Sequence, residues 1–269
     1  MVRKLAPLAV VALAVAGCGG SHASPPTTTI RQLHQFRVVF PEGFTRAQMA
    51  QRVQAVAKIA FRERHVHPKI SAKTYLAASG ARRIAGFGAQ KLPLEGFLFP
   101  STYDFDRKTT STELVGDQLA AFETNFGNVD MAYARSKNLT PYDVLKIASI
   151  VEREAVVPSE RPLVAAVIYN RLHDRMPLGM DSTIRYGLHV AGTQSLLESE
   201  LNSDNPYNTR KFLGLPPTPI SNPGLASIEA AAHPAHVDYL YFVRKPDKRH
   251  HYFTSNYQDF VNHEHLYGY

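Results

Sequence analysis

Two glutamates, Glu152 and Glu154, lie in a segment whose other residues are mostly apolar. A carboxyl group held among apolar neighbours loses hydration, which raises its pKa, so it can stay protonated near neutral pH. A protonated carboxyl group is what a general acid requires. The segment therefore indicates acid–base chemistry at one of these two glutamates.

The segment 141–154 has the features of a helix. Thr140 can cap its first turn, where a proline at position 141 is well tolerated. The two glutamates are about 200° apart on such a helix, so they cannot both point into one cleft, and periodicity does not choose between them. A structural explanation is also open, because glutamates near a helix end can bend to water or pair with an arginine. The polar face expected for this helix carries Lys146, Ser149 and Arg153.

The composition of the 269-residue chain is that of an ordinary globular protein, with 44% hydrophobic and 20% charged residues. The net charge of +7 is spread along the chain, and a mild basic excess suits an anionic polymer or surface. The sequence has no Gly-rich phosphate loop, no RNA-binding aromatic motif and no zinc-finger spacing. We therefore expect no nucleic-acid partner, no metal and no cofactor.

The N-terminus predicts export. After a basic start, the apolar stretch at 5–16 is too short to span a bilayer comfortably, and it ends at 13–18 in Leu-Ala-Val-Ala-Gly-Cys, which resembles a bacterial lipobox. We expect a lipoprotein signal peptide at 1–17, lipidation of Cys18, the only cysteine, and a flexible tether at 18–35. The protein would then lie at the extracytoplasmic face of the cell membrane. An ordinary secretory signal or a single N-terminal membrane-spanning anchor is the alternative.

Hydrophobic patterns predict a mixed α+β fold in two parts, a small α/β accessory module at 36–90 and a main domain at 91–269. Residues 176–224 are rich in Pro, Asn and Gly, and we expect them to form a packed, functional set of loops. The accessory module should contain a strand at 36–40 and helices that start near Thr45 and Ser71. The main domain should contain helices at 110–126, 141–154 and 225–232, a helix capped by Ser159, and a hairpin of 239–244 with 251–254.

Nine sequence blocks between residues 95 and 243 resemble, in order, those of the endolytic murein transglycosylase (YceG-like) family, bacterial enzymes that cut the glycan strands of peptidoglycan. The strand and Pro-Glu-Gly turn at 36–45 are similar to a further segment of that family. The blocks begin at Glu95, Ala148, Val167, Asp181, Pro206, Gly214, Ile220, Ala231 and Tyr239.

The resemblance implies that Glu152, in the block Ser-Ile-Val-Glu, is the catalytic acid. It would protonate the oxygen between N-acetylmuramic acid and N-acetylglucosamine. The same carboxylate would then take the proton of the muramoyl C6 hydroxyl, which closes on C1 to leave a 1,6-anhydro end. The sequence shows no obvious second carboxylate of the kind a hydrolase needs. The implied partners are peptidoglycan glycan strands, which the enzyme would terminate or trim, and peptidoglycan synthases at the membrane.

Ten other residues are candidates for binding the sugar or bracing the cleft, although packing, turn formation or ion pairs would explain them as well. Asn170 could hydrogen-bond an acetamido group, and Arg171 could instead pair with Glu154. The loop around Asp181 departs from the family pattern. The ten candidates are Glu95, Glu154, Tyr169, Asn170, Arg171, Asp181, Tyr207, Asn208, Thr209 and His233.

Three other functions compete with this interpretation. Histidines at 65–67, 250–251 and 263–265 suggest a metal-dependent hydrolase, but none has the helical spacing and placed carboxylate of such a site. A non-catalytic peptidoglycan-binding lipoprotein would keep the fold and lose the chemistry. A lysozyme-like hydrolase would release reducing ends in place of anhydro ends.

Overall fold

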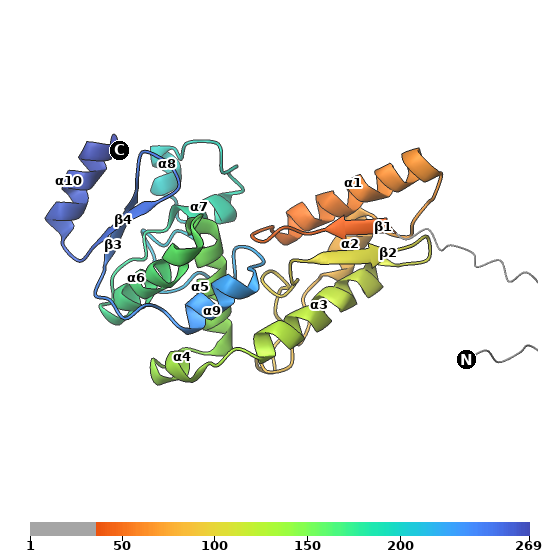
Figure 1. Cartoon of the computed structure of the whole chain (residues 1–269), viewed down its shortest axis with the longest axis horizontal. Coiled ribbons are helices and arrows are strands. Elements are labelled where there is room, and N and C mark those ends of the chain that lie inside the picture. The colour runs from red at the N-terminus through yellow and green to blue at the C-terminus, as the bar shows by residue number, and fades with distance from the viewer. Residues whose placement is uncertain (1–35) are drawn as a thin grey trace, which may run out of the picture. The chain divides into compact units, whose positions relative to one another are not determined.

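An antiparallel pair of strands with three helices forms the first part of the structure (Figure 1). The computed structural model describes residues 36–269. Strand β1 (Phe36–Val39) pairs with β2 (Thr102–Phe105). Helices α1 (Arg46–Arg64) and α2 (Ala72–Ala78) lie between these strands in the sequence, and α3 (Ser111–Gly127) follows β2.

Local sequence signals set the beginnings of these helices. Thr45 caps α1 and exchanges hydrogen bonds with Gln48, which forms a capping box, and Ser71 caps α2. Side chains alternate along the strands, so Val38 and its cross-strand partner Tyr103 both point into the core. The strand at 36–40 and the helices predicted near Thr45, near Ser71 and at 110–126 are confirmed.

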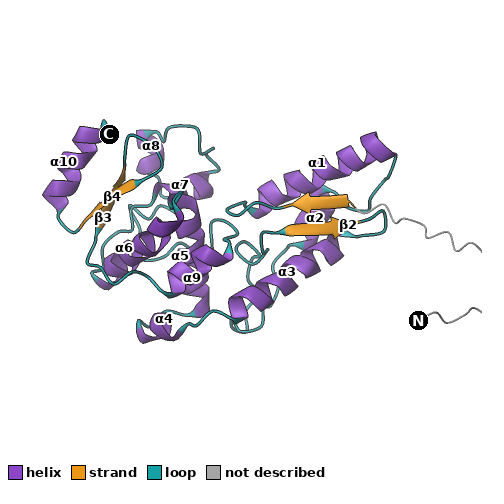
Figure 2. Cartoon of the chain, in the orientation of Figure 1, coloured by secondary structure: helices purple, strands orange, loops and turns teal. Residues whose placement is uncertain are grey.

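Helices dominate the rest of the described chain, and a second antiparallel pair of strands, a hairpin, lies near its end (Figure 2). This mixture of helices with two small antiparallel sheets confirms the predicted α+β fold. The elements are α4 (Ala132–Ser136), α5 (Pro141–Glu154), α6 (Arg161–His173), α7 (Asp181–Leu188), α8 (Glu198–Leu201), α9 (Leu225–Ala232), β3 (Tyr241–Arg244), β4 (His251–Thr254) and α10 (Tyr257–Tyr267).

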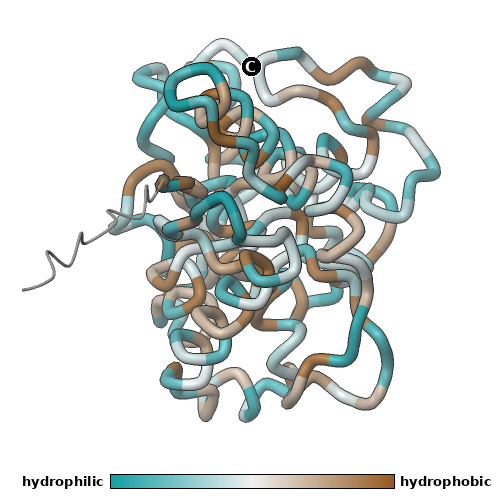
Figure 3. The backbone as a smooth tube through the Cα atoms, turned by 90° about the vertical axis from the view of Figure 1, so that its right-hand side faces the viewer, coloured by the Kyte–Doolittle hydropathy of each residue, from teal (hydrophilic) through white to brown (hydrophobic). Residues whose placement is uncertain are grey.

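Helix α5 packs beside α9 and α6 (Figure 1). Thr140 and Asp143 form its capping box, and Pro141 occupies its first position, as expected. Its apolar side chains are buried on nearly every side, and such packing, more than helix propensity, stabilises a helix of this length. Hydrophilic stretches of the chain lie mainly along the outer loops (Figure 3). The buried apolar residues of α5 are Val144, Leu145, Ile147, Ala148, Ile150 and Val151.

Two local predictions were wrong. Ser149, expected on the polar face of α5, is fully buried, because its hydroxyl donates to the Lys146 carbonyl and accepts the backbone N–H of Ile220. Ser159 lies inside a short 3₁₀ turn (Pro158–Glu160) and does not cap α6 in the described structure.

The region 176–224 is more regular than its composition predicts, because it contains α7 and α8. Asp181 is therefore the first residue of a helix and not part of a loop. The sequence of α7 has low helix propensity, and buried Thr183 and Ile184 stabilise it by packing. Helices α4 and α10 were also not predicted.

The division into domains at residue 90 stays a prediction. The β1–β2 pairing and the packing of α2 against α3 join residues on both sides of that position, and the described residues belong to one compact unit. The predicted signal peptide, Cys18 and the tether lie outside the described residues. Between residues 36 and 269, none of the helices has the length and apolar character needed to cross a bilayer.

Candidate active site

Glu152 lies in the last turn of α5, in a nearly closed environment. Its side chain is only 8% exposed. Its Oε2 atom accepts a hydrogen bond of 3.0 Å from the backbone N–H of Gly224, the residue that precedes α9. The carboxyl group is thus poorly hydrated, as the apolar pattern predicted, and one of its oxygens is fixed.

The loop that ends at Gly224 is held along the side of α5. Ile220 donates its backbone N–H to Ser149 Oγ at 3.0 Å. The Ser221 hydroxyl donates to the Ser149 carbonyl oxygen at 3.1 Å. Ser149 lies about one helical turn before Glu152, so one buried serine fixes the start of the loop where its end can reach the carboxylate.

A guanidinium and a second carboxylate complete the surroundings of Glu152. Nη2 of Arg161, the first residue of α6, lies 3.9 Å from Glu152 Oε1 and also 3.9 Å from Glu42 Oε2. The Arg161 side chain is 14% exposed, whereas that of Glu42 is 51% exposed. Two carboxylates therefore face one guanidinium, Glu152 from the interior and Glu42 from the surface.

Two glycines allow these groups to come so close. A Cβ on Gly224 would collide with the Glu42 carboxylate, which lies directly against the glycine backbone. Gly43 has a φ of +75°, and a Cβ there would meet Cγ of Glu152 at 3.4 Å. The Gly43 backbone N–H also donates to the Asn222 carbonyl at 2.9 Å, which ties the turn to the loop.

Glu42 was missed by the sequence analysis. It belongs to the Pro-Glu-Gly turn, and the pattern there indicates only a connection between a strand and a helix. Burial raises the pKa of Glu42, the negative charge of Glu152 raises it further, and Arg161 lowers it. One signal could have identified Glu42 as a functional residue: it is a carboxylate in a turn that resembles a segment of the endolytic murein transglycosylase family.

A third carboxyl group, that of Glu95, is buried behind the loop and is fully hydrogen bonded. It accepts the backbone N–H of Arg46 at 2.9 and 3.2 Å, the Tyr186 hydroxyl at 3.2 Å and the Asn222 amide at 2.8 Å. Burial raises the pKa of Glu95 to about 7, and these hydrogen bonds oppose that rise.

Asn222 connects Glu95 to the surroundings of Glu152. While its amide nitrogen donates to Glu95, its side-chain oxygen accepts the backbone N–H groups of Gly96 and Leu98, both at 2.9 Å. Asn222 precedes Gly224 by two residues, so this network holds the loop that presents the Gly224 N–H. Glu95 therefore stabilises the loop that contacts Glu152, and it does not contact Glu152 itself.

The cluster of Glu42, Glu152 and Arg161 is suited to moving a proton. Because Glu152 Oε2 accepts the Gly224 N–H, a proton on this carboxyl group would reside on Oε1, the oxygen nearer to Arg161. One guanidinium balances one carboxylate, so the cluster becomes neutral only when it holds a single proton. That is the charge balance expected of a group that both gives and takes protons.

Comparison with known proteins gives the evidence for the family. The YceG-like family model matches residues 21–265. The chain belongs to this family. The chain is 33% identical over 237 residues to an endolytic murein transglycosylase from Streptococcus pneumoniae, a match covering 82% of this chain and 43% of that protein. It is 40% identical over 157 residues to one from Bacillus subtilis, covering 58% of this chain and 43% of that protein.

A solved structure supports the same relationship. The crystal structure of a YceG-like protein from Listeria monocytogenes is similar with a TM-score of 0.67 and 29% sequence identity, covering 86% of this chain and 75% of that chain. The chain spans less than half the length of the curated relatives that it matches. The resemblance predicted from the nine blocks is confirmed.

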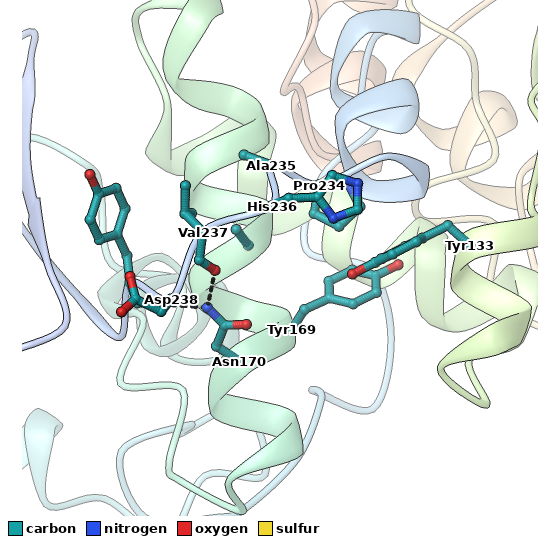
Figure 4. Close-up of a pocket in the computed structure, with 10 residues that line it drawn as sticks. Tyr133, Tyr169, Asn170, Pro234, Ala235, His236, Val237 and Asp238 are labelled. Atoms are coloured by element: carbon teal, nitrogen blue, oxygen red, sulfur yellow. Dashed lines mark hydrogen bonds between the residues drawn. The ribbon is translucent and has the colours of Figure 1, made fainter.

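Two residues from a family block, Tyr169 and Asn170, line a pocket of about 560 Å³ that Glu152 does not line (Figure 4). The Tyr169 hydroxyl donates to the Ala231 carbonyl at 2.7 Å. The Asn170 amide nitrogen donates to two backbone carbonyls of the segment after α9, each at 2.9 Å. Both amide hydrogens are thus used, and an acetamido N–H could bond only to the oxygen of Asn170.

Arg171 and Glu154 do not pair with each other. Arg171 donates to three backbone carbonyls, those of Pro177, Leu178 and Leu240. The Oε1 atom of Glu154 is buried and has no hydrogen-bond partner among residues 36–269. Neither residue joins the cluster around Glu152.

The remaining candidates from the sequence hold loops or lie at the surface. Asp181 forms an ion pair with Arg210 at 2.7 Å. The Tyr207 hydroxyl bonds to that of Thr218, and the Asn208 amide donates to two backbone carbonyls at and just after the end of α8. The Thr209 hydroxyl accepts the backbone N–H of Met180, and His233 is exposed at the end of α9. The contacts of Asp181, Tyr207, Asn208 and Thr209 hold segments of the chain together, and none of them is to Glu152.

The histidines considered as metal ligands have other partners. Nδ1 of His251 lies 2.7 Å from a carboxylate oxygen of Glu160, and Nδ1 of His250 lies at the same distance from Asp247. His263 stacks on the Tyr252 ring. Within the described part of the chain, no three His, Cys, Asp or Glu side chains gather as metal ligands would.

Proposed function

We propose that this protein is a lytic transglycosylase that cuts peptidoglycan glycan strands between N-acetylmuramic acid and N-acetylglucosamine and leaves 1,6-anhydro ends. The observation that carries the proposal is the state of Glu152: nearly buried, with Oε2 held by a backbone N–H and Oε1 left for a proton. The relatives named endolytic murein transglycosylases supply the substrate class.

The reaction follows from one carboxyl group. Glu152 donates its proton to the oxygen between the two sugars, and the bond from that oxygen to C1 of the muramoyl sugar breaks. The C6 hydroxyl of the same sugar then forms a bond to C1 and loses its proton to a carboxylate, with Glu152 now ionised and able to accept it. No water is consumed, because the internal hydroxyl replaces it.

We further propose that the protein acts at the extracytoplasmic face of the cell membrane, anchored by lipid on Cys18, close to the synthases that polymerise new strands. Cys18→Ala should move the protein out of the membrane fraction, unless the uncut signal holds it there, whereas the matched change Ser21→Ala should not. Unchanged fractionation of Cys18→Ala with a cleaved N-terminus would contradict the anchor.

A lysozyme-like hydrolase is the second candidate, and Glu42 is the observation that favours it. A hydrolase needs a second carboxylate near the acid, either as a nucleophile or to activate water. Glu42 and Glu152 share one guanidinium, so the required number of groups is present.

Digestion of purified sacculi in ¹⁸O-labelled water, followed by mass spectrometry of the fragments, tests the proposal. A lytic transglycosylase releases fragments that are one water lighter than hydrolysis products and that contain no ¹⁸O. Incorporation of ¹⁸O at new reducing ends would establish the hydrolase instead. Sedimentation with sacculi and no released fragments would identify a non-catalytic binding protein.

A further inference from the structure

Glu42 has no task in the reaction written above, yet its carboxylate lies beside that of Glu152. Both carboxylates approach the same nitrogen of Arg161, and both contact Gly224: Glu152 through the backbone N–H, and Glu42 against the glycine backbone. The Pro-Glu-Gly turn is also held here, because the Gly43 backbone N–H donates to the carbonyl of Asn222, in the loop that carries Gly224.

The two carboxylates differ in their access to solvent. Glu152 is 8% exposed, whereas Glu42 is 51% exposed. Of the two carboxylates that approach Arg161, that of Glu42 is therefore the one that a glycan arriving from solvent can contact first. A group in that position can contact the sugar and can exchange its proton with water between turnovers.

The charge balance allows Glu42, as well as Glu152, to accept the second proton. When Glu152 has given up its proton, two carboxylates face one guanidinium, and the cluster carries one excess negative charge. The proton of the C6 hydroxyl removes this excess whichever carboxylate accepts it. Both carboxylates are ionised at that moment, and that of Glu42, which is 51% exposed, is the one that can pass the accepted proton on to water.

We infer that Glu42 is a second catalytic residue of this centre and that its carboxylate takes the proton of the muramoyl C6 hydroxyl. This inference rests on the proposed lytic reaction. The proton of Glu152 goes to the bridging oxygen, the C1–oxygen bond breaks, the bond from O6 to C1 forms, and the O6 proton goes to Glu42. A proton then returns to Glu152 while Glu42 loses one, so the enzyme is restored without any co-reactant.

The charged groups around Glu42 come from two helices. Glu152 belongs to α5 and Arg161 to α6. Arg153, also on α5, donates from its guanidinium to the Gly43 carbonyl at 3.4 Å and forms no ion pair with Glu42 or Glu152. Burial and the charge of Glu152 raise the pKa of Glu42, and Arg161 lowers it. A base with a raised pKa is better matched to accepting a proton near neutral pH.

The test compares the rate of anhydro-fragment release as a function of pH for the wild type, Glu42→Gln and the matched control Glu123→Gln on an exposed part of α3. A base must be ionised, so the wild-type rate should fall as the pH drops below the raised pKa of Glu42. In Glu42→Gln the rate should be roughly a hundredfold lower, within the range that a positioned base contributes. The fall in rate at low pH, the acidic limb of the pH–rate profile, should disappear in Glu42→Gln. The pH–rate profile of Glu123→Gln should match that of the wild type.

Gly224→Ala provides a second variant that keeps Glu42 in the chain. The φ of Gly224 is −75°, which suits alanine, but the added Cβ must displace the Glu42 carboxylate at the end of its flexible side chain. We expect nearly unchanged thermal stability and a rate loss similar to that of Glu42→Gln. The double variant should be no slower than either single one, because both remove the same function.

Three results would overturn the inference. They are a wild-type rate in Glu42→Gln, a slower Glu42→Gln enzyme that keeps its acidic limb, and additive rate losses in the double variant. The proposed function fails separately, because in that case the wild type itself would release fragments that contain ¹⁸O or would release none.

Discussion

The carboxyl groups of Glu95 and Glu152 are both largely shielded from solvent, but their hydrogen-bond partners differ. Glu95 accepts hydrogen bonds from a backbone N–H, a hydroxyl and an amide, so that its two oxygens are saturated. Glu152 accepts a single backbone N–H, and its other oxygen has only a guanidinium at 3.9 Å. The two sites are connected through Asn222 and the loop that ends at Gly224.

This difference separates a structural carboxyl group from a reactive one. Burial disfavours the charged form of a carboxyl group, and saturating hydrogen bonds compensate for that penalty while they also immobilise the side chain. Glu95 therefore gains a fixed position and loses the freedom to exchange a proton with a ligand. Glu152 keeps one oxygen for chemistry, and the network around Glu95 supplies the rigidity that it needs.

Removal of the Glu152 carboxyl group should have the largest effect, and it tests the difference between Glu152 and Glu95 most strongly. Glu152→Gln preserves shape and removes the proton donor, so the rate of fragment release should fall by about a thousandfold or more, near the upper part of the range for general acids. Thermal unfolding and sedimentation with sacculi should be nearly unchanged. Release of fragments at a near-normal rate by this variant would contradict the assignment.

Removal of the shared cation should have a smaller effect on the rate than loss of either carboxyl group of the cluster. Arg161→Gln leaves two neighbouring carboxylates without compensation, and Arg161 normally lowers the pKa of Glu42. The acidic limb of the pH–rate profile should therefore move to higher pH, with a roughly tenfold lower rate at neutral pH. Arg161→Lys, which keeps the charge, is the matched control and should shift the limb less. A shift toward lower pH would be inconsistent with this electrostatic explanation.

The structural carboxyl group should affect stability more than chemistry. The pKa of Glu95, about 7 in the folded state, exceeds its value of about 4.5 when unfolded, so the folded protein retains a proton that the unfolded chain releases between these pH values. Its contribution to stability is therefore greatest below that window and is lost as the pH rises through it. Glu95→Gln should flatten this pH dependence.

The same substitution should also lower the unfolding free energy. In Glu95→Gln an NH₂ group would face donors, which costs about 1–3 kcal/mol. Denaturant titrations at pH 5 and pH 8, with Glu123→Gln as the control, measure both effects. An unchanged pH dependence in Glu95→Gln would show that another group is responsible.

The smallest effect is expected at Glu154. It lies two residues from Glu152 on the same helix but does not join the cluster with Arg161, so Glu154→Gln should change the rate of fragment release less than about twofold. Because one oxygen of Glu154 is buried without a hydrogen-bond partner in the described chain, its neutral replacement should also leave stability nearly unchanged or slightly higher. An inactive, folded Glu154→Gln protein would show that the wrong glutamate was assigned.

Local sequence signals were sufficient for most of the elements that carry the site. The Thr45–Gln48 and Thr140–Asp143 capping boxes set the starts of α1 and α5. The apolar pattern indicated a poorly hydrated carboxyl group at Glu152 or Glu154, and the family resemblance selected Glu152. The capping boxes and the apolar pattern depend on residues only three or four positions apart, so a single sequence contains them in full.

The rest of the site depends on contacts between distant segments. The approach of Glu42 to Glu152 requires the turn after β1 to meet the last turn of α5, and no local pattern encodes that. Ser149 likewise appears polar in the helical pattern, but the Ile220 N–H and the Ser221 hydroxyl allow it to be buried. Asp181 was assigned to a loop because tertiary packing, and not propensity, makes α7 helical.

The central claim is that Glu152 Oε1 is the atom that meets the bond to be broken. A crystal structure of the Glu152→Gln protein with an uncleaved glycan oligomer would test this directly. We expect the bridging oxygen at hydrogen-bond distance, about 2.6–3.2 Å, from the side chain at position 152, with Glu42 against the muramoyl sugar. A glycan bound instead in the pocket of Tyr169 and Asn170, with position 152 out of reach, would contradict it.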